Sequence, residues 1–391
     1  IFLLYHERGI MASRMLSERF SNGDDNEVNI RVESIYSFSV HLEIIDEIPP
    51  IFQRRDVLFQ LRLGMGEGKN VKYYLRPTER GTYSFGHVRV FVSSPIGLLQ
   101  RRFTLGQPAE VKVYPSYLML NQYELLAISN NLTEMGIKKI RRVGNNTEFE
   151  QIKDYVAGDD FRRINWRATA RTARLMVNVY QDERSQQIFN IIDKGRVMQQ
   201  AFRGMTYLDY AINASLVLSY IAMRKEDKAG IITFSDHEED LVPASRRTGH
   251  MQNILETLYR QRTHFAESDY SSLVMSVSQH VSKRSLLVLY TSFANEVGLK
   301  RQLPYLIQLN RRHRLLVVFF EDNEVKAYIK TPSTSDEAYY RHVIAEKYMN
   351  EQRLIVSTLK QHGILSLLTA PENLSVDVIN KYLEIKNRQQ I

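Results

Sequence analysis

The chain has 391 residues, and its 52 Lys and Arg outnumber its 44 Asp and Glu, which gives a net charge of +8. At roughly 150 residues per domain, this length predicts two or three domains. The chain contains no Cys, which excludes disulfides, thiolate metal sites and Cys nucleophiles.

Residues 1–27 are predicted to be a membrane-proximal segment and linker. Five apolar residues, Ile1–Tyr5, resemble the last turn of a segment that has been removed, and the cluster 21–26 is rich in turn residues. No run of the chain approaches the ~20 apolar residues that a membrane helix needs. The positive charge of the chain suits an anionic membrane surface or a nucleic acid, but it is equally ordinary for a protein without either neighbour.

Residues 28–115 are predicted to form a small antiparallel β-sandwich. Val28, Ile30 and Val32 alternate with polar residues, as in a strand with one buried face. Further short runs follow at about ten-residue spacing and are separated by turn residues, a pattern typical of β-sandwiches. The glycine-rich run at 64–68 lacks the Lys-Ser/Thr of a phosphate-binding loop.

Residues 184–391 change to alternating strands and helices. Apolar runs predict buried strands at 188–192, 229–234, 285–290, 315–320 and 364–368. Amphipathic runs predict helices near 205–224, 248–262, 270–283, 300–311 and 336–360, and from about residue 376. Such an alternation implies a parallel sheet covered on both faces. The expected fold class is therefore α/β plus all-β, with a doubly wound parallel sheet after the sandwich.

Residues 116–183 form a connector that contains an unusual motif. The motif comprises Glu148, Tyr155, Gly158, Asp159, Asp160, Arg162, Arg163, Trp166 and Arg171. It ends in the run Leu175-Met176-Val177 and includes the only Trp of the chain. Over residues 148–183 it closely resembles the motif of a bacterial family, the domain of unknown function 58. The segments 75–77, 80–83, 94–98 and 113–115 resemble the β-domain of the same family.

The resemblance implies several properties that composition does not. Family members usually carry two membrane helices before this region, so Ile1–Tyr5 would be the end of the second. The carboxyl half would be a von Willebrand factor A-like domain, and the expected partner is a MoxR-type AAA+ ATPase. No enzymatic activity is attached to the family. Arg8, Arg14 and Arg19 would place the soluble region on the cytoplasmic face of the bacterial inner membrane.

The motif also has a local structural interpretation. Residues Gly158, Asp159 and Asp160 are predicted to turn the chain and cap a short helix from about Phe161. That helix would leave Trp166 to pack between the two domains.

Two interpretations of the motif's arginines stay open. In the first, the arginines fasten the sandwich to the α/β domain by pairing internally: Arg162, Arg163 and Arg171 with Glu148, Asp159 and Asp160. In the second, they bind an anionic partner, since arginine forks suit carboxylates and phosphates. Nucleic acid is the weaker form of this interpretation, because aromatic residues for base stacking are few here.

The resemblance also predicts where a metal site would lie. A metal-binding von Willebrand A domain has Asp-x-Ser-x-Ser after its first strand, with Thr and Asp from later loops, a donor set that suits a hard cation. Here Asp193 remains, but Gly195 and Val197 replace both serines. Ser268 stands where Thr is expected, and Ser292 stands where Asp is expected. A degenerate site without metal or other cofactor is predicted.

Two cations next to this site suggest a different use for it. Lys194 and Arg196 would repel a divalent cation. We expect them to receive an acidic side chain of a partner directly.

The resulting functional hypothesis is a non-enzymatic, membrane-anchored scaffold that works with the ATPase or in envelope assembly, without a small-molecule substrate. An alternative is a phosphodiesterase or nuclease in which Asp159, Asp160 and Asp193 converge within ~5 Å around metal. A third possibility is a basic nucleic-acid-binding module. The ten His have no metalloprotease spacing, and the acidic run 236–240 is expected to be a solvated loop.

Overall fold

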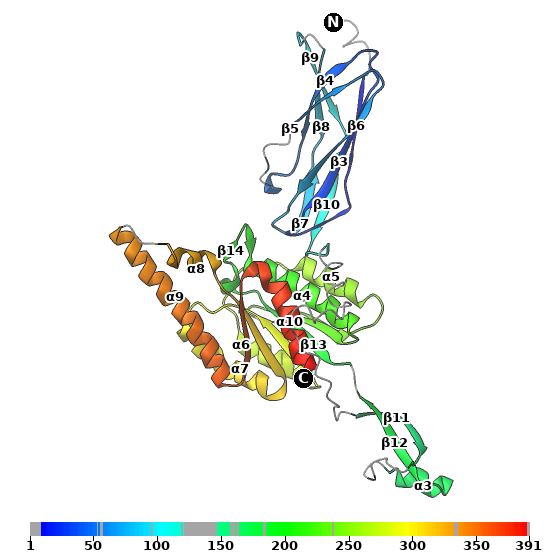
Figure 1. Cartoon of the computed structure of the whole chain (residues 1–391), viewed down its shortest axis with the longest axis vertical. Helices are drawn as coiled ribbons and strands as arrows, with labels where there is room; N and C mark the ends of the chain where they lie inside the picture. Colours follow the sequence, from blue (N-terminus) through cyan, green and yellow to red (C-terminus); the bar gives the residue numbers. More distant parts are fainter. Residues whose placement is uncertain are drawn as a thin grey trace.

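The computed structural model describes residues 9–52, 54, 58–94, 97–118, 120, 147–156, 161, 164–182, 185–236, 238–331 and 335–388. Ile1–Tyr5 and Arg8 therefore lie outside the described residues. The described chain forms a β-sandwich, an α/β domain and an arm (Figure 1). In Figure 1 the sandwich and the arm lie at opposite ends of the long axis, with the α/β domain between them. None of the described helices combines the length and the apolar character that crossing a membrane requires.

The sandwich contains ten strands in three sheets. They are β1 (Ile10–Met15), β2 (Arg19–Ser21), β3 (Asn26–Ser34), β4 (Val40–Asp46), β5 (Leu58–Leu63), β6 (Gly68–Leu75), β7 (Gly81–Phe85), β8 (Val88–Ser93), β9 (Gln100–Leu105) and β10 (Ala109–Tyr114). The sheet orders are β1-β3-β6, β5-β4-β8-β9 and β2-β10-β7. Alternate residues of β3, β4 and β8 form one buried core, as the period-two pattern predicts.

The sandwich begins well before residue 28, so the prediction of a linker is wrong for residues 10–27. The reason is pairing: β1 pairs antiparallel with β3, and β2 pairs parallel with β10. Arg14, which was expected to mark the cytoplasmic face, has a side chain only 2% exposed and forms an ion pair with Asp46. A cation neutralised inside the sandwich gives no information about membrane orientation.

The α/β domain has a six-stranded sheet in the order β17-β16-β13-β18-β19-β20. Its strands are β13 (Gln187–Asp193), β16 (Lys228–Phe234), β17 (Glu238–Ser245), β18 (Leu286–Tyr290), β19 (Arg314–Phe320) and β20 (Leu365–Thr369). Its helices are α4 (Tyr207–Arg224), α5 (His250–Arg260), α6 (Tyr270–His280), α7 (Glu296–Arg312), α8 (Asn323–Ile329), α9 (Asp336–Gln361) and α10 (Leu374–Asn387). The short strands β14 (Ala201–Phe202) and β15 (Met205–Thr206) form a hairpin before α4.

Every helix and strand predicted in this domain overlaps an observed one, but the sheet is mixed, not parallel. The difference is β17, which pairs antiparallel with β16 and occupies part of the acidic run 236–240 that was expected to be a loop. An edge strand needs only one neighbour, and its charged side chains can face water. Its pattern is therefore weak in the sequence.

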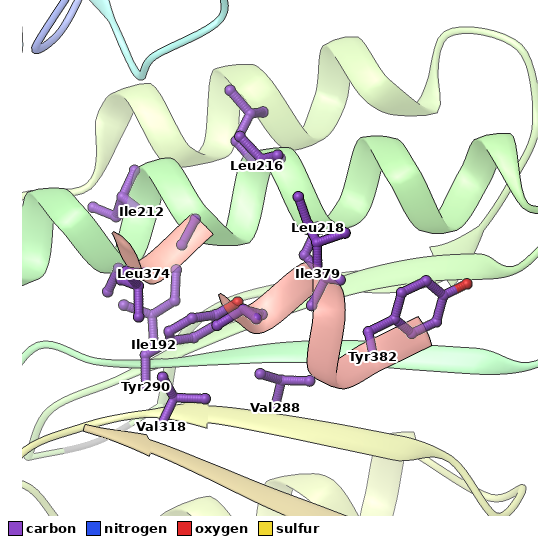
Figure 2. Close-up of a cluster of buried hydrophobic side chains, with 14 of the residues drawn as sticks. Ile192, Ile212, Leu216, Leu218, Val288, Tyr290, Val318, Leu374, Ile379 and Tyr382 are labelled. Carbon is purple, nitrogen blue, oxygen red and sulfur yellow. The ribbon is translucent and has the colours of Figure 1, made fainter. Parts of the chain in front are cut away.

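Helices cover both faces of the sheet and divide its strands into two cores. Val288 and Tyr290 of β18 join the core under α4, α5 and α10, whereas Leu287 and Leu289 join the core under α6, α7 and α9. Figure 2 shows the first core, with side chains of the strands facing those of α4 and α10. This packing fixes the sheet, and with it the loops at the carboxyl ends of the strands.

The arm consists of β11 (Thr147–Asp154) and β12 (Met176–Asp182), which pair antiparallel, and the short helix α3 (Trp166–Thr172) between them. Phe161 has a 3-10 helical backbone, as predicted, but α3 is a separate helix that begins later, because Ile164 forms a β-bridge with Val177. Asn165 caps the helix instead, and its side-chain oxygen accepts a hydrogen bond from the Ala168 amide at 3.0 Å.

The two large domains are joined by contacts outside the motif. The Arg80 Nε donates to Asp209 Oδ1 at 2.8 Å, and both side chains are less than 10% exposed. The rings of Tyr114 and Tyr259 stack at 4.4 Å between their centroids. The expected fastening by Arg171 is wrong, since Arg171 is exposed in the arm. Arg162 and Arg163 lie outside the described residues.

Candidate functional site

The candidate site is a crevice of about 440 Å³ at the carboxyl ends of β13 and β18. Chain order reverses between these strands, because β13 is followed by β16 on one side and by β18 on the other. Open α/β sheets usually bind ligands at such a switch point. Asp193 ends β13 and lines the crevice, together with Ser268 from the loop before α6 and Ser292 after β18.

The Asp193 carboxylate is completely buried and accepts four hydrogen bonds. Its Oδ1 accepts from the Gly195 amide at 2.8 Å and from Ser268 Oγ at 2.5 Å. Its Oδ2 accepts from Thr291 Oγ1 at 2.6 Å and from the Tyr270 hydroxyl at 3.3 Å. Two donors on each oxygen leave the carboxylate with little remaining capacity to bind another group.

Gly195 is required by this arrangement. A Cβ at Gly195 would lie 1.9 Å from Ser268 Oγ and 3.0 Å from Asp193 Oδ1. No L side chain fits there without moving Ser268 away from the carboxylate. Glycine at position 195 therefore has two consequences. It removes a serine that could bind a metal, and it leaves room for the Ser268 hydroxyl to reach the Asp193 carboxylate.

Burial raises the pKa of the Asp193 carboxyl, and the hydrogen bonds from Ser268, Thr291, Gly195 and Tyr270 oppose that rise. Burial also raises the pKa of Tyr270 well above its usual range, so this hydroxyl remains a donor. The site thus satisfies a buried carboxylate with neutral donors and no paired cation.

These residues do not fit a divalent cation. Magnesium requires six oxygens in near-octahedral positions, usually with more than one carboxylate or phosphate among them. Here one carboxylate has its lone pairs engaged, and Val197, at the second lost serine position, contributes only an apolar side chain to the crevice. Within the described part of the chain, no group of three or more His, Asp or Glu is placed to hold a metal.

The loop after β18, where the sequence predicted the position of an Asp ligand, differs in detail from that prediction. Ser292, at the position expected for an Asp ligand, lines the crevice, but the side chain that reaches Asp193 is Thr291. Thr291 directly follows β18, as Asp193 ends the neighbouring parallel strand β13, so strand adjacency was the signal that could have identified it. Tyr270, at the start of α6, was not anticipated at all.

Lys194 does not belong to a docking surface. It is only 1% exposed, and its ammonium donates to Gln261 Oε1 and to the Arg262 carbonyl, both at 3.0 Å. Burial lowers the pKa of Lys194 to about 8. The prediction that Lys194 faces a partner is therefore wrong, because the side chain turns inward beneath the loop that follows α5.

Two arginines on the rim supply the positive charge that the sequence assigned partly to Lys194. Arg196 is exposed, and Arg301 of α7 lines the same crevice with a side chain 66% exposed. Glu267 Oε1 lies 3.5 Å from Arg301 Nη1, and the Glu267 side chain is 81% exposed. Phe265 and Phe293 contribute apolar surface to the same crevice. The crevice therefore combines an apolar lining with a cationic rim.

The motif residues that the structure describes are not part of the crevice. Glu148 lies in β11, and Tyr155, Trp166 and Arg171 belong to the arm. Gly158, Asp159, Asp160, Arg162 and Arg163 lie outside the described residues, so a convergence of Asp159 and Asp160 with Asp193 lies outside them too.

Comparison with known proteins shows which family model part of this chain matches. Residues 151–327 match the family model "Protein of unknown function DUF58". The matched residues make up less than half of the chain. The resemblance inferred from the motif is thereby confirmed, and the matched residues extend from the arm through most of the sheet. An uncharacterized Bacillus subtilis protein, YeaD, is 22% identical over 267 residues. The alignment covers 66% of this chain and 64% of YeaD.

Two solved structures are similar to parts of the chain. The conserved hypothetical protein BatB from Bacteroides thetaiotaomicron is 8% identical with a TM-score of 0.34, covering 52% of this chain and all of BatB. The CARDB domain of the PF1109 protein from Pyrococcus furiosus is 13% identical with a TM-score of 0.20, covering 28% of this chain and 94% of that domain.

Proposed function

We propose that this chain is a non-enzymatic interaction module that binds a protein partner at the crevice. The observation that carries this proposal is the state of Asp193. A general base or metal ligand needs an accessible lone pair, whereas both oxygens of this carboxylate are occupied by hydrogen bonds from within the fold. The exposed charges of the crevice belong to its rim.

We further propose that the α/β domain is von Willebrand A-like. The strand order and the single antiparallel edge strand, β17, support this assignment. In such a domain a partner would dock at the carboxyl ends of the strands, where Asp193 and the crevice lie. The partner we propose is a MoxR-type AAA+ ATPase, and we propose that helices before this region anchor the protein in the membrane.

Arg196 and Arg301 give the proposed contact its chemistry. With no cation to bridge two oxygen ligands, an acidic side chain of the partner would bind the guanidinium groups directly. The apolar lining below them would accept the aliphatic part of that side chain. An interface charge pair that becomes desolvated in this way affects affinity far more than an exposed pair does.

The test is binding of the purified ATPase to the full-length protein and to its R196E/R301E variant. Reversing two rim charges is expected to weaken binding by at least tenfold, since truncating one partner of a buried charge pair costs about 2–5 kcal/mol. The R311E/R312E variant is the matched control, because it reverses the same number of charges at the exposed end of α7. Equal affinity of the two variants would refute docking at the crevice.

A further inference from the structure

The sandwich contacts the last turns of α5. The Arg80 Nη1 donates to the Leu258 carbonyl at 2.5 Å, in addition to its ion pair with the α4 side. Tyr114 contacts the same turns twice, since its hydroxyl donates to Glu256 Oε1 at 3.1 Å and its ring stacks on that of Tyr259. Figure 1 shows the end of the sandwich that carries β7 and β10 facing α5. The sandwich therefore holds the carboxyl end of this helix.

α5 leads directly into a loop that forms one wall of the crevice. Residues 261–269, here called the α5–α6 loop, contain neither helix nor strand. Phe265, Glu267 and Ser268 of this loop line the crevice. Phe265 has a φ of 53°, a backbone conformation that a bulky residue adopts only where surrounding contacts impose it. The shape of this wall thus depends on the contacts that hold the loop.

Buried polar contacts fix the start of the α5–α6 loop. Gln261 is buried, and its side chain donates to Asp240 Oδ2 at 2.7 Å and accepts from Lys194 Nζ at 3.0 Å. Thr263 Oγ1 donates to the Lys194 carbonyl at 2.5 Å. Burial lowers the pKa of Lys194, Asp240 opposes the decrease, and the positive charge of Arg80 adds to it. A cation of the sandwich therefore acts on the lysine that holds the loop.

The second half of the α5–α6 loop is tied to the strands of the sheet. The Arg196 amide, just after β13, donates to the Ala266 carbonyl at 2.9 Å, and the Asp269 amide donates to the Ser235 carbonyl, just after β16, at 2.6 Å. Contacts therefore continue without interruption from Arg80 of the sandwich, through the end of α5 and the loop, to the crevice.

We propose that the sandwich regulates the crevice. Its contacts with α5 keep the α5–α6 loop in the conformation that brings Phe265 and Ser268 into the crevice, and displacement of the sandwich releases the loop. Contacts between the domains of one chain resemble those of transient complexes, so relative motion of two domains is expected unless their interface is large and apolar. Coupling between two sites is reciprocal, so a partner bound at the crevice would also strengthen the junction. The regulatory role rests on the proposed function, whereas the coupling itself does not.

Hydrogen exchange of the 391-residue chain measures the coupling without a partner. The reporters are the Arg196 and Asp269 amides, which are bonded to carbonyls across the edge of the loop. In R80A we expect both amides to exchange about tenfold faster, because exchange follows local opening. The amides of β18 should remain protected over the same labelling time, which excludes global unfolding as the cause.

A milder variant keeps the test valid if R80A does not fold. T82A/Y114F removes two hydroxyls that face α5: Thr82 Oγ1 lies 3.1 Å from the Tyr259 hydroxyl, and the Tyr114 hydroxyl donates to Glu256. The stacked rings and the Arg80 ion pair remain. We expect about threefold faster exchange of the same two amides, since two exposed or half-buried hydrogen bonds are lost.

N213A is the matched control. It removes a different contact of the junction, the hydrogen bond that the Ser116 amide donates to Asn213 Oδ1 of α4 at 2.9 Å, and leaves the contacts with α5 intact. We expect the exchange of the native chain. Unchanged exchange in both R80A and T82A/Y114F would overturn the proposal, because the α/β domain would then hold the loop by itself. Equal acceleration in N213A would overturn it as well.

Binding of the purified ATPase separates this proposal from the proposed function. Faster exchange in T82A/Y114F together with weaker ATPase binding supports regulation of the crevice by the sandwich. Faster exchange with unchanged ATPase affinity would refute the regulatory role. If the native chain does not bind the ATPase at all, the proposed partner is refuted, whereas faster exchange of the Arg196 and Asp269 amides would still demonstrate the coupling.

Discussion

The buried site at the carboxyl ends of β13 and β18 differs from the exposed arm in how it uses polar and charged side chains. At this site and at the junction of the two large domains, charged groups are buried and have hydrogen-bonding partners. Asp193 accepts four hydrogen bonds, and Arg80 forms an ion pair with Asp209. In the arm, Trp166 and Arg171 are exposed. The polar groups of the first region stabilise the fold, whereas the described side chains of the second are exposed on the surface.

This difference shows why a conspicuous motif need not mark a buried site. The family motif is the most distinctive part of the sequence, yet Tyr155, Trp166 and Arg171 lie in the arm, outside the described hydrophobic cores. Conversely, Arg80 lies outside this motif, just before β7, and joins the two domains. Substitutions at the two kinds of position should therefore have very different effects on stability.

The largest expected effect is that of R80A. Removing one member of a buried ion pair leaves its partner charged and unpaired, which costs about 3–5 kcal/mol. Urea denaturation of the full chain measures this loss. The double variant R80A/D209N should recover part of the loss because the remaining amide is uncharged. A loss below about 1 kcal/mol for R80A would mean that water replaces the guanidinium at the junction.

The pH dependence of K194M gives an intermediate effect. Burial lowers the pKa of Lys194 to about 8 in the folded protein, below its ordinary value of 10.5. Below pH 8 the lysine is charged in both states, and the penalty for burying the charge is complete. Above pH 8 the folded state releases its proton first, so stability from this residue rises until the pH reaches the unfolded pKa.

The native chain should therefore gain about 1–2 kcal/mol relative to K194M between pH 8 and pH 9.5. Urea denaturation of both proteins at several pH values in this window measures the difference, and other titrating groups cancel in the comparison. Parallel stability profiles would show that Lys194 keeps its ordinary pKa and that its hydrogen bonds to Gln261 and Arg262 compensate for burial.

The α/β domain was predictable from the sequence because its strands are uninterrupted apolar runs, such as Leu315–Phe320, between amphipathic helices. The edge strand β17 was missed because its first three residues are acidic. The start of the sandwich was missed because β1 and β2 are weak alone and are stabilised by pairing with β3 and β10. In both cases the deciding contact is distant in sequence, which periodicity cannot show.

The candidate site was predictable in part. The resemblance to a von Willebrand A metal site identified Asp193 and Ser268, which lie in contact. The direction of Lys194 was not predictable, since its burial depends on Gln261 and the Arg262 carbonyl beyond α5. The position of Trp166 was not predictable either, because its exposure depends on the hydrogen bond and bridge that fix where α3 begins.

The smallest expected effect, that of W166A on stability, tests the comparison most directly. A large aromatic residue in a core costs about 3–5 kcal/mol when truncated to Ala, and burial between the two domains, as the sequence suggested, would predict a loss of that size. With 69% of Trp166 exposed on α3, we expect a change within about 0.5 kcal/mol. Urea denaturation followed by circular dichroism measures it without relying on the removed fluorophore. A loss of more than about 2 kcal/mol in the free energy of unfolding would mean that Trp166 is packed against other residues. The arm would then not differ from the buried site in the exposure of its side chains. A loss near zero would agree with an exposed Trp166 side chain that packs against neither domain.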